Sequence, residues 1–241
     1  MDEMYIPVRV GSALADNDFG YQRDDQGDNI SKHNPYLAEL TALYWGWKNL
    51  DADFIGLAHY RRHFSSSKSN WKFERVLSSR DAEKLCEKYD VILPKKRHYY
   101  IETLASHYGH VHDIEHLELT REILKEKYPE YVEAFDKVMK RTSGHMFNMC
   151  IMKRDVLNSY CTWLFDILFA LEEEIDGTNL SAFDKRLYAR VGELLMDVWL
   201  EQNNINYKDI DFVQIGDENW PKKIKGFLNA KFRGKKYDRS K

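Results

Sequence analysis

The sequence predicts a single α/β domain, with a mostly parallel sheet flanked by helices and a helical C-terminal half. In the first hundred residues, a helical pattern is twice followed by a short apolar strand pattern, which is typical of parallel strands joined by crossover helices. Long amphipathic patterns dominate after residue 113. We expect residues 1–221 to form the domain and residues 222–241 to form a basic tail.

The first helical pattern begins at Asn34-Pro35, where Asn is a favourable N-cap and Pro a favourable first helical residue. Apolar residues then recur at helical spacing up to about Leu50. A short apolar strand pattern begins at Phe54 and ends near Ala58.

The later elements follow from the same two periodicities. A second helix and strand are expected at Ser79–Tyr89 and Val91–Pro94, and another strand at His145–Met152. Further helices are expected at residues 113–139 with a break at Pro129, from Asp155 to Leu171, and at Ser181–Glu201; Ile210–Gly216 is expected to close the sheet.

The composition indicates a soluble globular protein. Of the 241 residues, 43% are hydrophobic and 31% are charged, a balance that excludes a wholly disordered chain. No apolar run approaches the ~18 residues of a membrane-spanning helix, and the first residues lack the regions of an export signal. The three cysteines lie far apart, as expected of reduced thiols in a cytoplasmic protein.

The net charge of −3 conceals a basic C-terminal segment. Residues 222–241 hold nine Lys or Arg and one acidic residue, a net charge of +8, whereas the rest of the chain carries −11. Apolar residues recur among these cations at helical spacing, which predicts a segment lying on an anionic membrane surface. A disordered solubilising tail, or one that contacts nucleic acid, is the alternative; we expect no nucleic-acid partner.

A cluster of cations follows the predicted strand at Phe54. His59, Tyr60, Arg61 and Arg62 stand where that strand ends, and in open α/β sheets ligands bind beyond the carboxyl ends of the strands. Guanidinium groups bind phosphates bidentately, so the cluster is a candidate site for a diphosphate. The alternative is a solvated strand end whose charges pair with surface carboxylates.

A polar loop from Gly20 to Asn34 leads into the first helix. Asp24, Asp25 and Asp28 present hard carboxylate oxygens, which suit Mg²⁺ or Mn²⁺. The helix N-terminus that follows favours anions. A turn-rich loop without any ligand explains the same composition equally well.

The segment from His112 to His116 matches the short metalloprotease pattern H-x-x-E-H. On one helix the two histidines would lie one turn apart and could share a zinc ion, with Glu115 as general base. A chance match is easy because the neighbouring sequence is rich in histidine. A zinc-dependent hydrolase is therefore the less favoured alternative.

Two further polar residues stand out in the C-terminal half. Asn148 interrupts an apolar strand pattern and must find hydrogen-bond partners there, either in the protein or in a ligand. Glu193 belongs to a polar stripe with Arg186, Arg190 and Asp197 on the last helix. The pattern alone predicts a solvated helix face.

Four blocks of the sequence carry a family resemblance: GDNISKHNPYLAELTALYWGWKN, DFIGLAHYRRHF, HMFNMCIMKRDVLNSYCTWLFDIL and the helix from Arg186 to Leu200. Together they resemble a family of bacterial glycosyltransferases of capsular and exopolysaccharide synthesis, long catalogued as a domain of unknown function. The resemblance covers Tyr5 to about Leu200. It implies a GT-A-like fold and transfer of a hexosyl unit, in some members galactofuranosyl, from a nucleotide-sugar donor to a lipid-linked glycan acceptor. It also implies a protein peripheral to the inner face of the plasma membrane.

Carried over by position, the resemblance implies roles for individual residues. Asn148 would bind the acceptor, and Glu193 and His145 are the candidate catalytic residues. A metal at the donor would be Mg²⁺ or Mn²⁺. Eight residues would lie against the donor: Asp24, Asp25, Asp28, Asn29, His59, Tyr60, Arg61 and Arg62.

Family members usually have a further strand before the segment equivalent to Tyr5-Ile6-Pro7, and this sequence shows none. In a GT-A-like fold the first strand helps to build the nucleotide pocket. The resemblance therefore leaves a second interpretation, a catalytically impaired module that binds nucleotide or glycan.

Overall fold

The computed structural model describes residues 2–17 and 19–216, and its central feature is a four-stranded sheet with the order β3-β8-β5-β9. β3 (Phe54–Leu57) and β5 (Val91–Pro94) confirm the two apolar strands predicted from the sequence. β8 (Cys150–Lys153) lies between them and is antiparallel to both, whereas β9 (Tyr207–Ile210) is parallel to β5. The prediction of a mostly parallel sheet is therefore wrong. The alternation of helix and strand does not reveal that a later strand enters between two earlier ones.

Within the described residues, three pairs of short strands lie outside this sheet. β4 pairs with β10 in antiparallel fashion, so the segment predicted to close the sheet is divided between β9 and this second pair. The bounds of the short strands are β1 (Val8–Arg9), β2 (Gln22–Arg23), β4 (Arg62–Phe64), β6 (Arg97–His98), β7 (Ser143–Gly144) and β10 (Phe212–Gln214).

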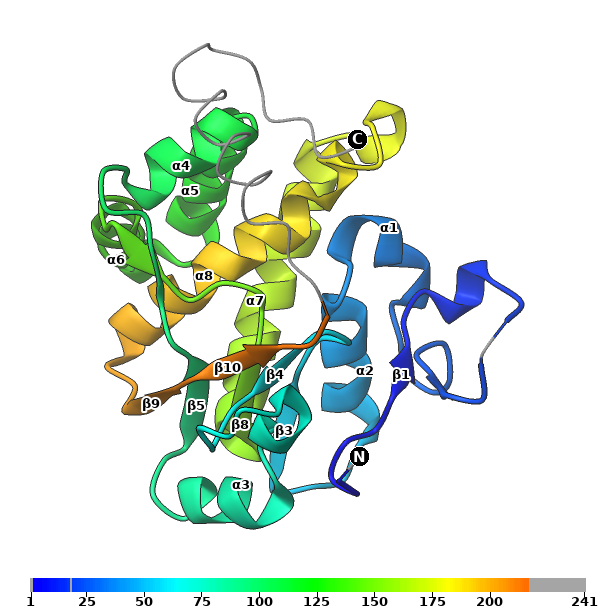
Figure 1. The fold of residues 1–241 in the computed structure, drawn as a ribbon. Coiled ribbons are helices and arrows are strands. Elements are labelled where there is room, and N and C mark those ends of the chain that lie inside the picture. Colours follow the sequence, from blue (N-terminus) through cyan, green and yellow to red (C-terminus); the bar gives the residue numbers. More distant parts are fainter. Residues whose placement is uncertain (1, 18, 217–241) are drawn as a thin grey trace.

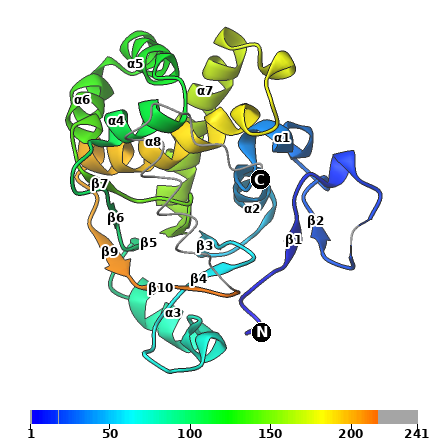
Figure 2. The same cartoon turned by 45° about the horizontal axis from the view of Figure 1, so that its top comes forward.

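Helices surround the sheet, and the helical C-terminal half is confirmed. Figure 1 shows α7 behind the sheet and α8 crossing above it. In Figure 2, α4, α5 and α6 gather on one side of the molecule, and β1 and β2 lie beyond α2 on the other side. The helices are α1 (Asn34–Leu37), α2 (Leu40–Asn49), α3 (Ser79–Cys86), α4 (Leu104–Val111), α5 (Glu115–Lys127), α6 (Val132–Met139), α7 (Arg154–Glu174) and α8 (Leu187–Asn203).

The main core forms where α7 and α8 pack on each other and on the sheet. Leu164 and Leu168 of α7 and Leu195 and Val198 of α8 are completely buried. Burial of such side chains is the main source of folding free energy, at roughly 25 cal/mol per Å² of apolar surface. The predicted break at Pro129 is confirmed, because a 3₁₀ turn there separates α5 from α6.

The first predicted helix is interrupted at Ala38, which has φ 48° and ψ −124°. The Asn34 side chain donates to the Ala38 carbonyl oxygen at 2.9 Å instead of capping a helix. The chain restarts as α2 immediately after Glu39. The prediction of a single helix from Asn34 to Leu50 is therefore wrong. The junction between α1 and α2 places Glu39 on the wall of a cavity.

The predicted strand from His145 to Met152 begins only at Cys150. Phe147 and Asn148 have φ values of 81° and 53°, and a left-handed backbone cannot continue a strand. Asn tolerates this conformation better than other side chains do. The apolar pattern before Cys150 thus belongs to a buried turn.

Candidate functional site

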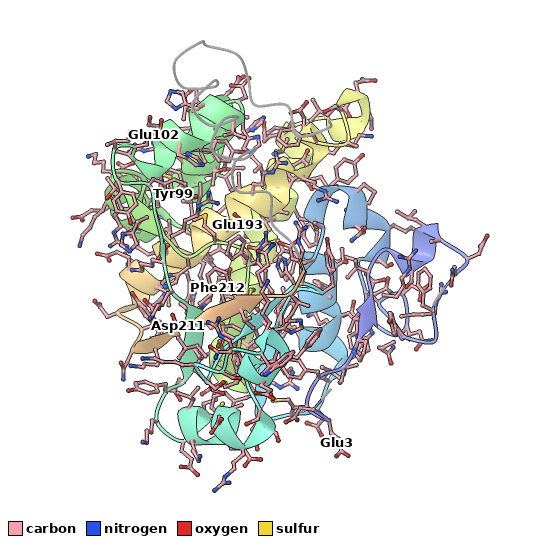
Figure 3. The ribbon with its side chains drawn as sticks, in the orientation of Figure 1. Glu3, Tyr99, Glu102, Glu193, Asp211 and Phe212 are labelled. Atoms are coloured by element: carbon pink, nitrogen blue, oxygen red, sulfur yellow. The ribbon has the colours of Figure 1, made fainter. Side chains whose placement is uncertain are left out.

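A cavity of about 1250 Å³ opens between the β3–β4 turn, the α1–α2 junction, α4, α8 and residues 4–8. All four residues of the predicted strand-end cluster, His59 to Arg62, line it. Glu193 of α8 lines the same cavity, and Figure 3 labels it near the centre of the molecule. The fold thus brings together the cation cluster and one of the two candidate catalytic residues.

The strand-end cluster is shaped by a tight reversal of the backbone. His59 and Arg62 exchange two backbone hydrogen bonds, of 3.0 and 3.3 Å, so Tyr60 and Arg61 form the tip of a hairpin. The Tyr60 side chain is 85% exposed, and the Arg61 guanidinium lies 5.5 Å from the centre of its ring. The Ile215 amide fixes the tip by donating to the Arg61 carbonyl oxygen at 2.8 Å. This tip can present cationic groups to a ligand.

His59 has a different role from the cations beside it. Its Nε2–H donates to the Phe147 carbonyl oxygen at 2.5 Å, and Nε2 lies 3.8 Å from Oε1 of Glu39. Burial lowers the pKa of His59, although the Glu39 charge and the Phe147 hydrogen bond oppose this effect. The imidazole is therefore neutral at neutral pH and serves as a hydrogen-bond donor.

Glu193 is the acid in the cavity whose proton affinity is altered most. Burial and the negative charge of Glu39 raise the pKa of Glu193 to about 7. A backbone hydrogen bond from Phe147 and the charges of Arg190 and Arg62 act in the opposite direction. A carboxyl group with a pKa near neutrality in a cavity is typical of a proton-transfer site.

Asn148 is hydrogen-bonded to Glu39, the residue whose charge acts on Glu193. Its Nδ2 donates to Oε1 of Glu39 at 2.8 Å and to the Ala189 carbonyl oxygen at 3.0 Å, and the residue is 4% exposed. Its Oδ1 has no hydrogen-bond partner within residues 2–17 and 19–216. The role predicted for Asn148 in binding the acceptor stays a prediction.

Sequence reasoning missed several cations of the cavity. Arg190 of α8, Arg186 just before α8 and Arg97 of β6 all line it. The Arg190 guanidinium lies 2.9 Å from His112 Nδ1 and 4.0 Å from the centre of the Phe183 ring. The available signal was the polar stripe on the last helix, of which Arg186, Arg190 and Glu193 line the cavity, whereas Asp197 is buried against His145.

The sequence also provided no reason to select His107 of α4 as a cavity residue. His107 lines the cavity, its Nδ1 lies 3.0 Å from Oε2 of buried Glu102, and its ring centre lies 4.0 Å from that of Tyr99. Burial lowers the pKa of His107, while the hydrogen bond with Glu102 opposes this. Figure 3 labels Tyr99 and Glu102 on the segment that leads into α4.

Tyr21 and Asn34, near the two ends of the polar loop, line the cavity, but the four loop residues predicted to bind the donor, Asp24, Asp25, Asp28 and Asn29, do not. Asp24 has no exposed surface, and its two oxygens accept four hydrogen bonds that hold the loop together. The donors and their distances are Gly11 N (2.9 Å), Ser12 N (2.9 Å), Ser31 Oγ (2.5 Å) and Thr41 Oγ1 (2.8 Å). This arrangement organises the chain before α1, and the donor contact predicted for Asp24 stays untested.

The other loop residues also bind neighbours within the protein. Asp25 accepts two hydrogen bonds from Arg23, which lower the pKa of its carboxyl group. Asp28 accepts from the Tyr44 hydroxyl at 3.3 Å, and Asn29 donates to two backbone carbonyl oxygens of the loop. The described residues contain no group of three or more His, Cys, Asp or Glu arranged to hold a metal ion. The loop carboxylates thus bind partners within the protein, and the Mg²⁺ or Mn²⁺ expected at the donor stays a prediction.

His145, the second candidate catalytic residue, is buried away from the cavity lining. Its Nδ1 lies 2.8 Å from Asp197 and its Nε2 lies 2.9 Å from Asp209. Burial alone would lower the pKa of His145, but the hydrogen bonds and charges of these two carboxylates outweigh burial and raise it. His145 thus joins α8 to β9 as an imidazolium. The catalytic role predicted for it stays untested.

The two histidines of the H-x-x-E-H pattern do not share a helix. His112 follows the last residue of α4, and His116 lies on α5 with its Nδ1 3.0 Å from the Tyr108 hydroxyl. The expectation of one continuous helix is wrong, because the chain leaves helical geometry at His112, where φ is −129° and ψ −177°.

Comparisons with known proteins show the family of the chain and a solved structure with a similar fold. The fold is similar to that of a WbbM bifunctional glycosyltransferase, solved in its apo form, with a TM-score of 0.82 and 30% identity over 90% of this chain. The chain spans 43% of the length of that protein. The chain belongs to the family described as Domain of unknown function (DUF4422), whose model matches residues 1–204. No curated protein matches it.

Two of the sequence-based expectations concern membranes. Within the part of the chain that the structure describes, every helix is too short or too polar to cross a bilayer. The basic segment of residues 222–241 lies outside the described residues, so its predicted contact with an anionic surface stays a prediction.

Proposed function

We propose that this protein is a glycosyltransferase that moves a hexosyl unit, such as galactofuranosyl, from a nucleotide-sugar donor to a lipid-linked glycan acceptor in capsule or exopolysaccharide synthesis. The similarity to WbbM supports the class of reaction. The hexosyl unit, the acceptor and the pathway follow from the sequence blocks described above and belong to the proposal.

One observation carries the proposal: the same cavity holds a group of arginines and an acid with a pKa near neutrality. Glycosyl transfer requires both, since the departing diphosphate needs positive charge and the acceptor hydroxyl must lose a proton. Arg61 and Arg62 reach the cavity from the hairpin tip, and Arg190 reaches it from α8. Guanidinium groups in a cavity stabilise developing phosphate charge without reorganising during the reaction.

In this proposal the arginines hold the diphosphate and Glu193 accepts the proton of the acceptor hydroxyl. A base is most effective when its pKa lies close to the working pH, and that of Glu193 is about 7. Base catalysis of this kind belongs to a mechanism that inverts the anomeric carbon. Arginines can take over the charge stabilisation that a metal supplies in other enzymes, so no step in this proposal passes through a metal.

Two other functions can be distinguished from sugar transfer by experiment. A zinc-dependent hydrolase would need His112 and His116 to bind one ion, and elemental analysis of the purified protein measures this directly. A module that binds nucleotide or glycan without catalysis would use the same cavity, and it would bind a nucleoside diphosphate without turning over any sugar nucleotide.

The donor site is tested by isothermal titration calorimetry with UDP and GDP as probes. We expect at least one of them to bind, and we expect Arg61→Ala and Arg62→Ala each to weaken that binding by roughly tenfold, since a charged hydrogen bond contributes ~1.5–3 kcal/mol. Arg121→Ala is the matched control, because Arg121 pairs with Asp136 on the surface and does not line the cavity. Equal affinities in all four chains would refute the arginine site.

A further inference from the structure

The turn before β8 is a strained part of the cavity wall. Phe147 and Asn148 are consecutive non-glycine residues with positive φ. Such residues persist only where the surrounding structure holds them in place, and they gather at functional sites. The contacts of these two residues show what holds them.

The turn contacts three separate parts of the wall. The Phe147 carbonyl oxygen accepts from His59 at the end of β3, and the Phe147 backbone hydrogen-bonds to Glu193 on α8. The Asn148 amide donates to Glu39 at the α1–α2 junction and to the Ala189 carbonyl oxygen on α8. One dipeptide therefore contacts the carboxylates of both Glu39 and Glu193, although these come from different elements.

We propose that Asn148 is a positioning residue, whose amide fixes the Glu39 carboxylate close to Glu193 so that the two acids bind protons as one coupled unit. This inference rests on the proposed function, in which Glu193 receives the acceptor proton. It adds a role for Glu39 and Asn148 that the sequence alone did not indicate.

The hydrogen-bond donors decide which acid carries the charge. The Asn148 amide donates to the Glu39 carboxylate, and a donated hydrogen bond favours the charged form of a carboxylate. That charge then holds the proton on Glu193. The other charged or titratable groups that act on the pair are Arg62, Arg190 and the neutral His59, with Arg61 acting on His59.

The residue type at position 148 meets three demands together. It must accept a left-handed backbone, fit beside Gly192 and donate a hydrogen bond without adding a charge. A Cβ atom at Gly192 would lie 3.4 Å from Asn148 Oδ1 and 3.1 Å from Leu40 Cδ1, so little space remains there. Asn meets all three demands, whereas Gly meets the first two and Asp adds a charge.

The test is a pH titration of Glu193 by ¹³C NMR of the side-chain carboxyl carbons, with the signal assigned by its loss in Glu193→Gln. It compares the wild-type chain with Asn148→Gly, Glu39→Gln and the double variant. Glycine accepts the left-handed backbone, so Asn148→Gly removes the amide and leaves the turn intact.

We expect a wild-type midpoint of about 7. Both single variants should lower it by roughly one pH unit, because Glu39→Gln removes the charge beside Glu193 and Asn148→Gly removes the hydrogen bond that holds this charge in place. The double variant should match Glu39→Gln, since both changes act through the same interaction. A wild-type midpoint in Asn148→Gly would overturn the proposal, and so would an unchanged midpoint in Glu39→Gln.

If Asn148→Gly does not fold, Glu39→Gln decides the test, because it leaves the turn unchanged and removes the charge beside Glu193. A wild-type midpoint in that variant would overturn the proposal.

The titration needs no substrate, so it separates this inference from the proposed function. Sugar transfer is measured in parallel across pH, and the acidic limb of kcat/KM should move with the Glu193 midpoint in each variant. Titrations that shift as expected in chains that transfer no sugar would count against the proposed function and leave the coupled pair in place. If the acidic limb of kcat/KM stays at the same pH while the Glu193 midpoint shifts, the coupling of Glu39 and Glu193 has no role in catalysis.

Discussion

Glu193 and Asp197 lie one turn apart on α8, yet their carboxyl groups meet opposite surroundings. Glu193 lines the cavity near the negative charge of Glu39, whereas Asp197 accepts from both the backbone N–H and the Nδ1–H of His145. Burial and repulsion by Glu39 therefore raise the pKa of Glu193, whereas Asp197 belongs to a buried ion pair with His145. The negative charge of Glu193 thus destabilises the fold, and that of Asp197 is compensated by a cation.

Glu193→Gln should stabilise the fold, and more so at high pH. Because the pKa of Glu193 is raised above its unfolded value, the folded chain binds this proton more tightly, and stability falls as pH rises from about 4.5 to 7. Removing the acid should make the gain in unfolding free energy about 2 kcal/mol larger at pH 8 than at pH 5. Denaturant unfolding at both pH values measures this.

The control for that change is Glu201→Gln on the same helix. Glu201 pairs with Lys137 and Arg141, whose hydrogen bonds lower the pKa of its carboxyl group. Its removal should leave stability at pH 8 unchanged or reduced. A gain of equal size in both variants would show that the environment of Glu193 is not the cause.

Asp209→Asn should destabilise the protein in a way that depends on pH. The pKa of His145 is raised, so the stabilisation from its charged form is complete below about pH 6.5 and is lost as pH rises through the folded value. Replacing Asp209, which is the more exposed partner, should lower the melting temperature more at pH 6 than at pH 9. Asp211→Asn breaks only the exposed pair with Lys95 and should have little effect at either pH. An equal loss at both pH values would contradict an imidazolium at His145.

Ala38→Gly should stabilise the junction that carries Glu39. Ala38 has φ 48° and ψ −124°, a conformation that glycine adopts without steric cost. We expect a gain of about 1 kcal/mol in unfolding free energy. The matched Ala42→Gly lies inside α2 and should lose a similar amount, at roughly 1 kcal/mol for glycine in a helix. A loss in both variants would mean that Ala38 is not strained.

Removal of residues 222–241 should weaken binding to anionic vesicles at low salt. The segment carries a net charge of +8, and each basic residue near such a surface contributes ~1 kcal/mol. Sedimentation with phosphatidylserine-containing vesicles compares the full and shortened chains, and neutral vesicles serve as the control. Equal partitioning of both chains would remove the predicted membrane contact.

The sequence predicted those parts of the fold that depend on local patterns. The apolar runs at β3 and β5 and the break at Pro129 are local and were correct. The direction and order of the strands depend on β8, which enters between β3 and β5 although it follows β5 by more than 50 residues, and no local pattern contains that information.

The candidate site shows the same limit. His59 to Arg62 were found because they follow a strand, and they do line the cavity. The polar stripe on α8 was interpreted as a solvated face, because helical spacing shows which residues share a face but not what that face meets. The left-handed backbone at Phe147 and Asn148 breaks a pattern that predicts a strand, and it occurs where the protein brings its cavity residues together.

The most direct test is acceptor-dependent release of nucleoside diphosphate from a panel of UDP- and GDP-hexoses, in the presence of a lipid-linked glycan acceptor. We expect the wild-type chain to turn over at least one donor, and Glu193→Gln to reduce the rate by at least ~10²-fold, the scale of general base catalysis. Equal rates in both chains would contradict the role of Glu193. The absence of acceptor-dependent release by the wild-type chain with every donor would contradict the assignment as a glycosyltransferase.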